Sequence, residues 1–211
     1  MLDGPKAVPK LKASGEKAMN RHVVAFTLLV SVCGLSLLRA ESPEKQTDPS
    51  GDKARKAFEH MKKLSGDWEG KSTKGWTERI SYRVIAGGSC LMDLSYGAHP
   101  NEWMASMIHM DGDRLMLTHY CVAKNQPRLV ATEMADDLSS ITFTYLDATN
   151  LPSRDKGHMD KCLIRFDGKD KFFSRWTWYE DGKESWMEDI EHRRIKGEAV
   201  KDPLTPSDAG K

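Results

Sequence analysis

The segment LTHYCVAKNQPR, residues 117–128, gathers several side chains that can do chemistry. His119 and Cys121 supply an imidazole and a thiol, and Asn125 and Gln126 supply two side-chain amides just before a proline. Side chains of these types can hydrogen-bond the polar group of a ligand, coordinate a soft metal or take part in acid–base chemistry. Which of these they do depends on the strands that hold them and on what lies beside them.

A second group of such residues follows further along the chain. Asp147 and Asn150 lie in a loop after one predicted strand, and His158 opens the next strand. Successive strands of an antiparallel meander run in opposite directions, so this loop falls at the same end of the sheet as residues 124–127. We therefore predict a ligand-binding site at one mouth of a barrel, formed by His119, Cys121, Asn125, Gln126, Asp147, Asn150 and His158.

The two-residue period of a strand indicates which of these side chains point inward. In the predicted strand 114–123, His119 and Cys121 share a face with Leu115 and Leu117, which we expect to be the inner face. A register shift of one residue would put Tyr120 inside instead of His119. In the predicted strand 158–166, one face carries His158, Cys162, Ile164 and Phe166.

Other interpretations of these residues stay open. Two imidazoles and two thiols suit zinc, but no Cys-x-x-Cys spacing is present. Haem ligation or enzymatic catalysis would use His119 or His158, yet residues i and i+2 of a strand point in parallel and no Gly-x-Ser-x-Gly elbow occurs. We therefore predict no catalytic residue, no metal site and no cofactor. A barrel filled by its own side chains, with no ligand, is the remaining alternative.

The rest of the chain predicts one short helix followed by strands. Asp52 can cap a helix whose apolar stripe consists of Ala54, Phe58, Met61 and Leu64. After Trp68 the period becomes two; for example, Cys90, Met92, Leu94 and Tyr96 alternate with Ser89, Asp93 and Ser95, which is typical of a half-buried strand. Further strands are predicted at 67–73, 76–84, 102–110, 114–123, 128–134, 139–147, 158–166, 170–179 and 183–193.

Ten strands joined by short connections predict an all-β fold. Asp111-Gly112, Asp167-Gly168 and Asp181-Gly182 are strong hairpin turns. An up-and-down antiparallel meander exposes two edges unless it closes, so we predict a closed barrel with one short N-terminal helix, occupying residues 52–196.

A family resemblance supports the same fold. The segment LSGDWEG, residues 64–70, resembles the Gly-x-Trp opening of the calycins, which include lipocalins and fatty-acid-binding proteins. Together with THYC, NQP, DATNL and GHM it is similar to a family of uncharacterised secreted bacterial lipocalin-like proteins, over about residues 58–194. The resemblance implies a small barrel with an internal cavity and a Trp plugging one end. It implies no reaction.

The two ends of the chain predict processing and localisation. A short basic region, 16 apolar or small residues over 23–38, and Ala40 before a polar stretch are typical of a secretory signal peptide cut after Ala40, with Met19 as the natural start. We expect a polar linker at 41–51, a disordered tail at 197–211, and a secreted or periplasmic protein with no stable membrane span.

Charge and cysteine content limit the partners. The chain has 32 Lys and Arg residues, of which six precede residue 41, and 31 Asp and Glu residues, of which two precede it. The chain from residue 41 onward therefore has 26 basic and 29 acidic residues, a net charge of −3. This balance argues against nucleic-acid binding, so the expected partner is a small molecule, mainly apolar, with polar contacts at the rim. The sequence leaves open the oligomeric state, the ligand and the oxidation state of Cys90, Cys121 and Cys162.

Overall fold

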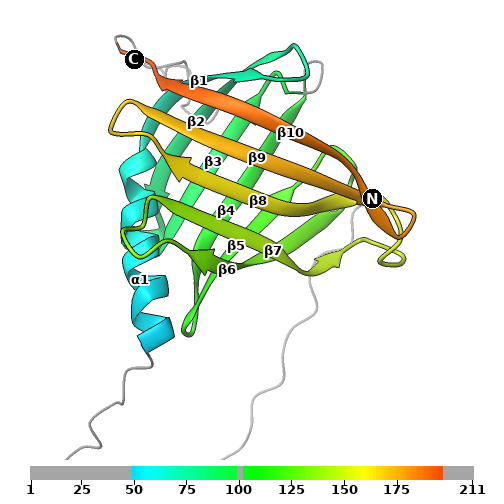
Figure 1. The fold of residues 1–211 in the computed structure, drawn as a ribbon, viewed down its shortest axis with the longest axis horizontal. Coiled ribbons are helices and arrows are strands. Elements are labelled where there is room, and N and C mark those ends of the chain that lie inside the picture. The colour runs from blue at the N-terminus through cyan, green and yellow to red at the C-terminus, as the bar shows by residue number, and fades with distance from the viewer. Residues whose placement is uncertain (1–48, 99–101, 197–211) are drawn as a thin grey trace, which may run out of the picture. The chain divides into compact units, whose positions relative to one another are not determined.

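The computed structural model describes residues 49–98 and 102–196 as a closed barrel of ten antiparallel strands with one N-terminal helix (Figure 1). Each strand pairs with its neighbours in sequence, and the barrel closes where the first strand pairs with the last. The predicted fold class is therefore confirmed. The predicted signal peptide, most of the linker and the tail lie outside the described residues. Within the described ranges no helix is long and apolar enough to cross a membrane.

The helical segment consists of α1 (Pro49–Met61) and the short 3-10 turn η1 (Lys62–Leu64), and a second 3-10 turn, η2 (Ala86–Gly88), joins two strands. The strands are β1 (Gly66–Ser72), β2 (Thr77–Ile85), β3 (Cys90–Tyr96), β4 (Trp103–Asp111), β5 (Arg114–Tyr120), β6 (Gln126–Met134), β7 (Ser140–Thr149), β8 (His158–Phe166), β9 (Lys171–Glu180) and β10 (Lys183–Arg194).

One end of the barrel, called here the helix end, is covered by α1 and carries the turn between β4 and β5. Arg55 donates a hydrogen bond to Gly112 O at 3.3 Å, and Lys53 pairs with Asp136 in the β6–β7 turn at 2.7 Å. The apolar stripe of α1 packs into the barrel, as predicted, through the buried residues Ala54, Ala57, Phe58 and Met61, followed by Leu64 of η1. Full burial of such side chains stabilises the fold by about 1.5–3 kcal/mol for each large one.

Trp68 plugs the helix end, as the resemblance implies. Its side chain is 1% exposed, and its indole N–H donates to Leu64 O at 2.7 Å. The Arg194 guanidinium lies 4.0 Å from the ring centre and donates to the carbonyls of Lys63 and Ser65. Trp68 therefore joins η1, β1 and β10 at the point where the barrel closes.

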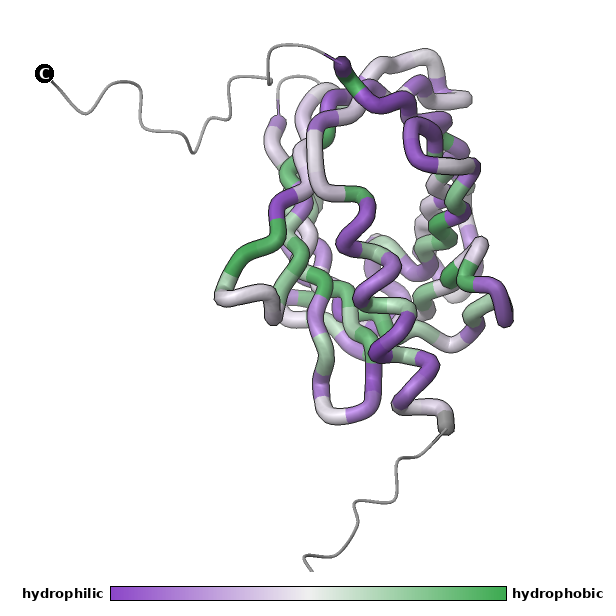
Figure 2. The backbone as a smooth tube through the Cα atoms, turned by 90° about the vertical axis from the view of Figure 1, so that its left-hand side faces the viewer, coloured by the Kyte–Doolittle hydropathy of each residue, from purple (hydrophilic) through white to green (hydrophobic). Residues whose placement is uncertain are grey.

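The opposite end, called here the loop end, carries the connection between β5 and β6 and the long connection between β7 and β8. Asn125 Nδ2 donates to Gly157 O at 2.8 Å, and Asn150 Nδ2 donates to Lys124 O. These contacts confirm the prediction that the two connections meet at the same end. Hydrophobic and hydrophilic residues follow one another along the strands that join the two ends (Figure 2).

Several predicted boundaries shift by a few residues. The helix begins at Pro49, inside the expected linker, and β5 ends at Tyr120, so Cys121 lies just beyond the strand. β6 begins at Gln126 and β7 continues to Thr149, because the two strands remain paired up to Gln126 and Thr149. The strands of this hairpin therefore extend further toward the loop end than their hydrophobic pattern indicates.

In β3 the inner face is not the more apolar one. β3 buries Leu91, Asp93 and Ser95, while its more apolar face is turned outward and only half-buried. On that outer surface Met92 lies opposite Met107 of β4, so apolar side chains pair across strands outside the barrel. The consequence is that a carboxyl group and a hydroxyl group face the interior.

Candidate functional site

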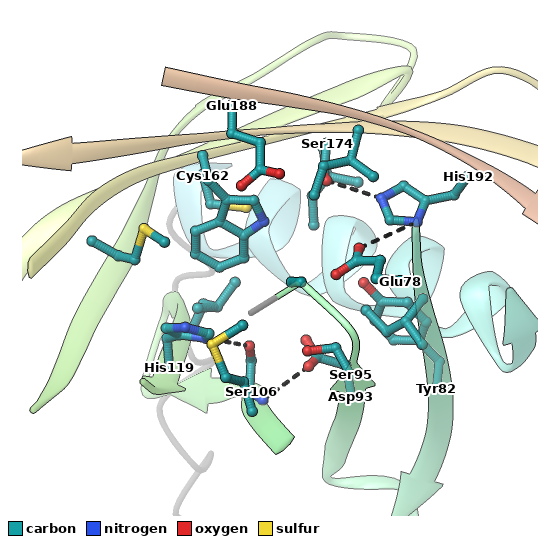
Figure 3. Close-up of a pocket in the computed structure, with 18 residues that line it drawn as sticks. Glu78, Tyr82, Asp93, Ser95, Ser106, His119, Cys162, Ser174, Glu188 and His192 are labelled. Atoms are coloured by element: carbon teal, nitrogen blue, oxygen red, sulfur yellow. Dashed lines mark hydrogen bonds and ion pairs between the residues drawn. The ribbon is translucent and has the colours of Figure 1, made fainter. Parts of the chain in front are cut away.

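An internal cavity of about 40 Å³ lies among strands β2 to β5 and β8 to β10. Figure 3 shows its lining, in which carboxyl, imidazole and hydroxyl groups converge from different strands. One buried water needs roughly 10–15 Å³ of such space, so the cavity has room for about three waters or a compact ligand. Its polar lining residues are Glu78, Asp93, Ser95, Ser106, His119, Ser174, Glu188 and His192.

His119 is the predicted site residue that the structure places in this cavity. Its side chain is 5% exposed, Nδ1 lies 3.1 Å from Ser106 Oγ, and the ring packs 4.9 Å from the Trp176 ring. Nε2 has no hydrogen-bond partner in the described part of the chain. Burial lowers the pKa of His119 to about 4, because the charged imidazolium would lose its hydration, so the ring is neutral at neutral pH. Tyr120 is 48% exposed, which confirms the predicted register of β5.

Asp93 is the second buried group at this side of the cavity. It accepts a hydrogen bond from Ser106 N at 3.0 Å, and Ser106 therefore links Asp93 to His119 (Figure 3). Burial raises the pKa of Asp93 to about 7, although its hydrogen bonds with Ser106 act in the opposite direction. In this chain the serine lies between the acid and the imidazole, whereas a catalytic triad has the histidine in the middle.

His192 and Glu78 face the cavity from β10 and β2. His192 Nε2 lies 3.0 Å from Ser174 Oγ, and its ring stacks on Phe172 at 4.0 Å between centres. Nδ1 has no hydrogen-bond partner among the residues that the structure describes, and it lies 3.7 Å from Glu78 Oε1. Burial lowers the pKa of His192 to about 3. This imidazole is also neutral at neutral pH.

Glu78 and Glu188 bring two more buried carboxyl groups to the cavity. Glu78 is 5% exposed, and burial, reinforced by the negative charges of Glu188 and Asp93, raises its pKa to about 8. Burial also raises the pKa of Glu188, against hydrogen bonds that include one from the Ser72 hydroxyl. Both acids therefore favour their protonated forms more than exposed carboxyl groups do.

Four of the predicted rim residues hold the loop end together. Asn125 and Asn150 bridge the connections as described above, and Gln126 accepts a hydrogen bond from Thr149 at 2.6 Å. Asp147 forms a bidentate pair with Arg128, and both side chains are about half exposed. None of these four side chains lines the cavity in the part of the chain that the structure describes.

His158 occupies a separate cluster. The Arg154 guanidinium packs 3.8 Å from the Tyr179 ring centre and donates to Asp160 at 2.5 Å, while its Nη1 lies 2.6 Å from His158 Nε2. His158 Nδ1 lies 2.5 Å from Lys156 O, and burial lowers the pKa of the ring. This histidine is fully buried and its two ring nitrogens are both partnered.

A bulge explains why His158 does not share the face of Cys162. The register of β8 against β9 shifts between Met159 and Lys161, so one extra residue enters the strand. Met159 then lines the cavity together with Cys162 and Ile164. The prediction that His158 and Cys162 face the same space is therefore wrong.

The three described cysteines lie where burial disfavours the thiolate form. Cys90, Cys121 and Cys162 are all free in the structure. Burial raises the pKa of each thiol, and that of Cys162 rises far above its ordinary value, so the thiolate form is disfavoured. Cys121 is half-buried beyond the end of β5 and does not line the cavity. Among the described residues, no three His, Cys, Asp or Glu side chains are arranged to hold a metal ion.

Sequence reasoning missed the carboxyl groups of this site. A charged residue in a strand ordinarily faces the solvent, so the residue types of Glu78, Asp93 and Glu188 gave no reason to place them inside the barrel. The available signal was their spacing: Glu78 falls on the same face as Ile80 and Tyr82, and Glu188 on the same face as Ile190 and His192.

Comparison with known proteins shows distant similarity of fold. No protein-family model and no curated protein matches the chain. Among solved structures, a protein of unknown function from the DUF3598 family of Nostoc punctiforme matches 63% of this chain and 48% of its own length, with 11% identity and a TM-score of 0.44. Rv2717c from M. tuberculosis matches 66% of this chain and 98% of its own, with 12% identity and a TM-score of 0.47. The ten-stranded barrel of this chain is shown by its own strand pairing.

Proposed function

We propose that this barrel binds one small, compact organic ligand in its internal cavity. The observation that carries the proposal is His119 Nε2, a buried ring nitrogen that faces the cavity and has no hydrogen-bond partner among the described residues. An unpaired polar atom in a protein interior costs free energy comparable to a lost hydrogen bond, unless a ligand or water pairs with it. A ligand that hydrogen-bonds His119 would remove this cost.

The lining indicates an amphipathic ligand. Apolar side chains make up about half of the wall and can contact the ligand body, as expected for a mainly apolar ligand. The polar contacts differ from the expectation, because they come from the cavity interior rather than from the rim. The apolar part of the wall consists of Ile80, Ala98, Met104, Leu117, Met159, Ile164, Trp176 and Ile190.

We also propose that the protein acts outside the cytoplasm, in the periplasm or as a secreted protein. The support is the apolar segment 23–38 between Arg21 and Ala40, whose length and flanking residues suit a cleaved signal peptide. A barrel of this kind would then capture a ligand from the extracytoplasmic medium.

Native mass spectrometry of the protein purified from its own cells tests the ligand. We expect a retained organic mass that is lost on denaturation, because the ligand is held by burial and hydrogen bonds alone. In His119→Ala the retained fraction should fall about tenfold, the effect of losing one hydrogen bond of about 1.4 kcal/mol.

The control is His109→Ala. His109 lies on β4, is half-buried and does not line the cavity, so this variant should retain as much ligand as the natural protein. A protein that is empty when isolated natively, and whose melting temperature no added small molecule raises, would favour a filled structural barrel.

A further inference from the structure

We propose that the ligand carries a cationic nitrogen group, an ammonium or a guanidinium, that pairs with the carboxyl groups of Glu78, Asp93 and Glu188. This inference rests on the proposed function and names the chemical class of ligand that the cavity selects.

Among the described residues, no Lys or Arg lowers the pKa of Glu78 or Asp93, and Glu188 is influenced by Lys74, which does not line the cavity. Each of these three acidic residues is at most 5% exposed, and all three point toward the same space (Figure 3). No Lys or Arg is found among the described residues that line the cavity. Elsewhere the chain pairs partly buried acids; Asp189, for example, accepts a bidentate contact from Arg175, and Asp67 accepts a single hydrogen bond from Arg83 Nη2. Buried carboxylates are ordinarily paired in this way, so the cavity differs from the rest of the barrel.

Two buried imidazole nitrogens point independently to a ligand rich in N–H donors. Within residues 49–98 and 102–196 neither His119 Nε2 nor His192 Nδ1 has a hydrogen-bond partner, and the two residues line the cavity from different strands. Burial keeps both rings neutral, so each can present an unprotonated nitrogen as an acceptor. A cation with several N–H groups would satisfy carboxyl oxygens and imidazole nitrogens at once.

The same residues disfavour other classes of ligand. An anion would oppose ionisation of the surrounding carboxyl groups and would be repelled by those that are ionised. A metal ion needs several donors converging on one point, and no three such side chains do so among the described residues. A guanidinium spreads its donors over a plane, which suits acceptors that are distributed around a cavity.

Binding of a cation should release protons. The pKa of Glu78 is about 8 and that of Asp93 about 7, so an empty cavity near neutral pH holds much of its carboxyl content protonated. A cation favours the charged form of a neighbouring acid, and the displaced protons go to the solvent. The titratable groups that face the cavity are Glu78 and Tyr82 on β2, Asp93 on β3, His119 on β5, Cys162 on β8, and Glu188 and His192 on β10.

Guanidinium and urea provide a matched pair of probes, because they have nearly the same size and shape and differ in charge. We would titrate each into the full-length labelled chain at millimolar concentrations and constant ionic strength, and follow the ring signals of His119 and His192 by NMR. At about pH 8.5 guanidinium should bind at least tenfold more tightly than urea. At about pH 5.5 this preference should largely disappear, because the carboxyl groups are then protonated.

Two variants test whether the preference for guanidinium over urea arises in the cavity. Glu78→Gln keeps the shape of the side chain and removes the charge, so guanidinium binding at about pH 8.5 should weaken about tenfold while urea binding stays the same. Glu133→Gln is the control, because Glu133 is an exposed residue of β6 outside the cavity, and it should bind both probes as the natural protein does.

The outcomes separate this inference from the proposed function. Equal binding of guanidinium and urea at both pH values would overturn the cationic assignment and leave a cavity that accepts small ligands. If neither probe shifts the two histidine signals, the cationic assignment is also wrong. Native mass spectrometry then decides the proposed function, which survives if a neutral or anionic organic ligand is retained and fails if the cavity is empty.

Discussion

Two kinds of buried titratable residue line the cavity. His119 and His192 have lowered pKa values, about 4 and about 3, while Glu78 and Asp93 have raised values, about 8 and about 7. Burial is the main cause in all four, because it penalises the charged form of acids and bases alike. Near neutral pH the empty cavity is therefore polar but carries little charge.

These shifts predict how stability depends on pH. Between pH 4.5 and about 8 folded Glu78 keeps a proton that the unfolded chain has released, so its contribution to stability is lost as pH rises toward 8. Asp93 acts in the same direction between 3.8 and about 7. The histidines act oppositely, because the unfolded chain takes up protons below pH 6.5 that the folded state does not. From about pH 4.5 to 6.5 the two effects oppose each other.

Above pH 6.5, of these four groups, only Glu78 and Asp93 change the free energy of unfolding with pH. We expect the free energy of unfolding to fall by on the order of 2–3 kcal/mol between about pH 6.5 and 8.5, with most of the loss due to Glu78. Glu78→Gln should remove most of this slope, and the exposed Glu133→Gln should retain it. Urea unfolding at a series of pH values measures the effect. A Glu78→Gln variant with the natural slope would show that Glu78 is ionised in the folded state.

The candidate site could be predicted from the sequence only in part. His119 follows Leu115 and Leu117 at a spacing of two, so its inward position could be read from the pattern. Asp93 could not, because the apolar residues of β3 favour the opposite face. A charged residue among apolar neighbours is ordinarily solvent-facing, and only the barrel interior provides the serine and imidazole groups that accompany it.

At the scale of the element, short-range sequence patterns predicted the positions of strands and turns well. They predicted less well which face of each strand is buried. The Asp-Gly pairs at 111, 167 and 181 all form turns between consecutive strands. A bulge such as the one between Met159 and Lys161 reverses which alternate residues of a strand face inward. The hydrophobic pattern of the strand does not reveal it. This is the physical reason why His158 could be assigned to the correct end of the barrel but not to the correct face.

Arg194 gives a prediction about how β10 is fixed to the helix end. Its guanidinium covers the Trp68 ring and donates to the carbonyls of Lys63, Ser65 and Lys169. A lysine has no planar fork and cannot satisfy three carbonyls while it covers a ring. Arg194→Lys should therefore lower the free energy of unfolding by about 1–3 kcal/mol.

Chemical denaturation measures this difference, with Arg193→Lys as the matched control. Arg193 is the preceding residue of β10 and is exposed, so its replacement should change the stability by less than about 0.5 kcal/mol. Equal effects of the two replacements would mean that β10 is held by its strand pairing with β1 and β9 rather than by the contacts of Arg194.

At the scale of the whole molecule, the fold class was predictable because ten strands with short connections leave few arrangements. An open meander would expose two edges, and pairing of β1 with β10 removes both. The interior was not predictable to the same extent, because closure brings together residues far apart in sequence, such as Glu78 and His192. Composition and periodicity describe each strand by itself and contain no information on such pairs.

The apolar segment 23–38 predicts that the chain is exported before it folds. A 16-residue apolar segment is shorter than the roughly 20 residues that span a bilayer, so we expect it to direct export and then be removed after Ala40. Protein isolated from the extracytoplasmic fraction should begin at Glu41, as measured by intact mass and N-terminal sequencing. Leu29→Arg interrupts the apolar segment and should keep the chain uncleaved inside the cell, whereas Lys45→Gln, beyond the cleavage site, should be exported normally. A membrane-bound chain that retains residues 19–40 would instead mean that this segment is an anchor and that the barrel binds its ligand while tethered to the bilayer.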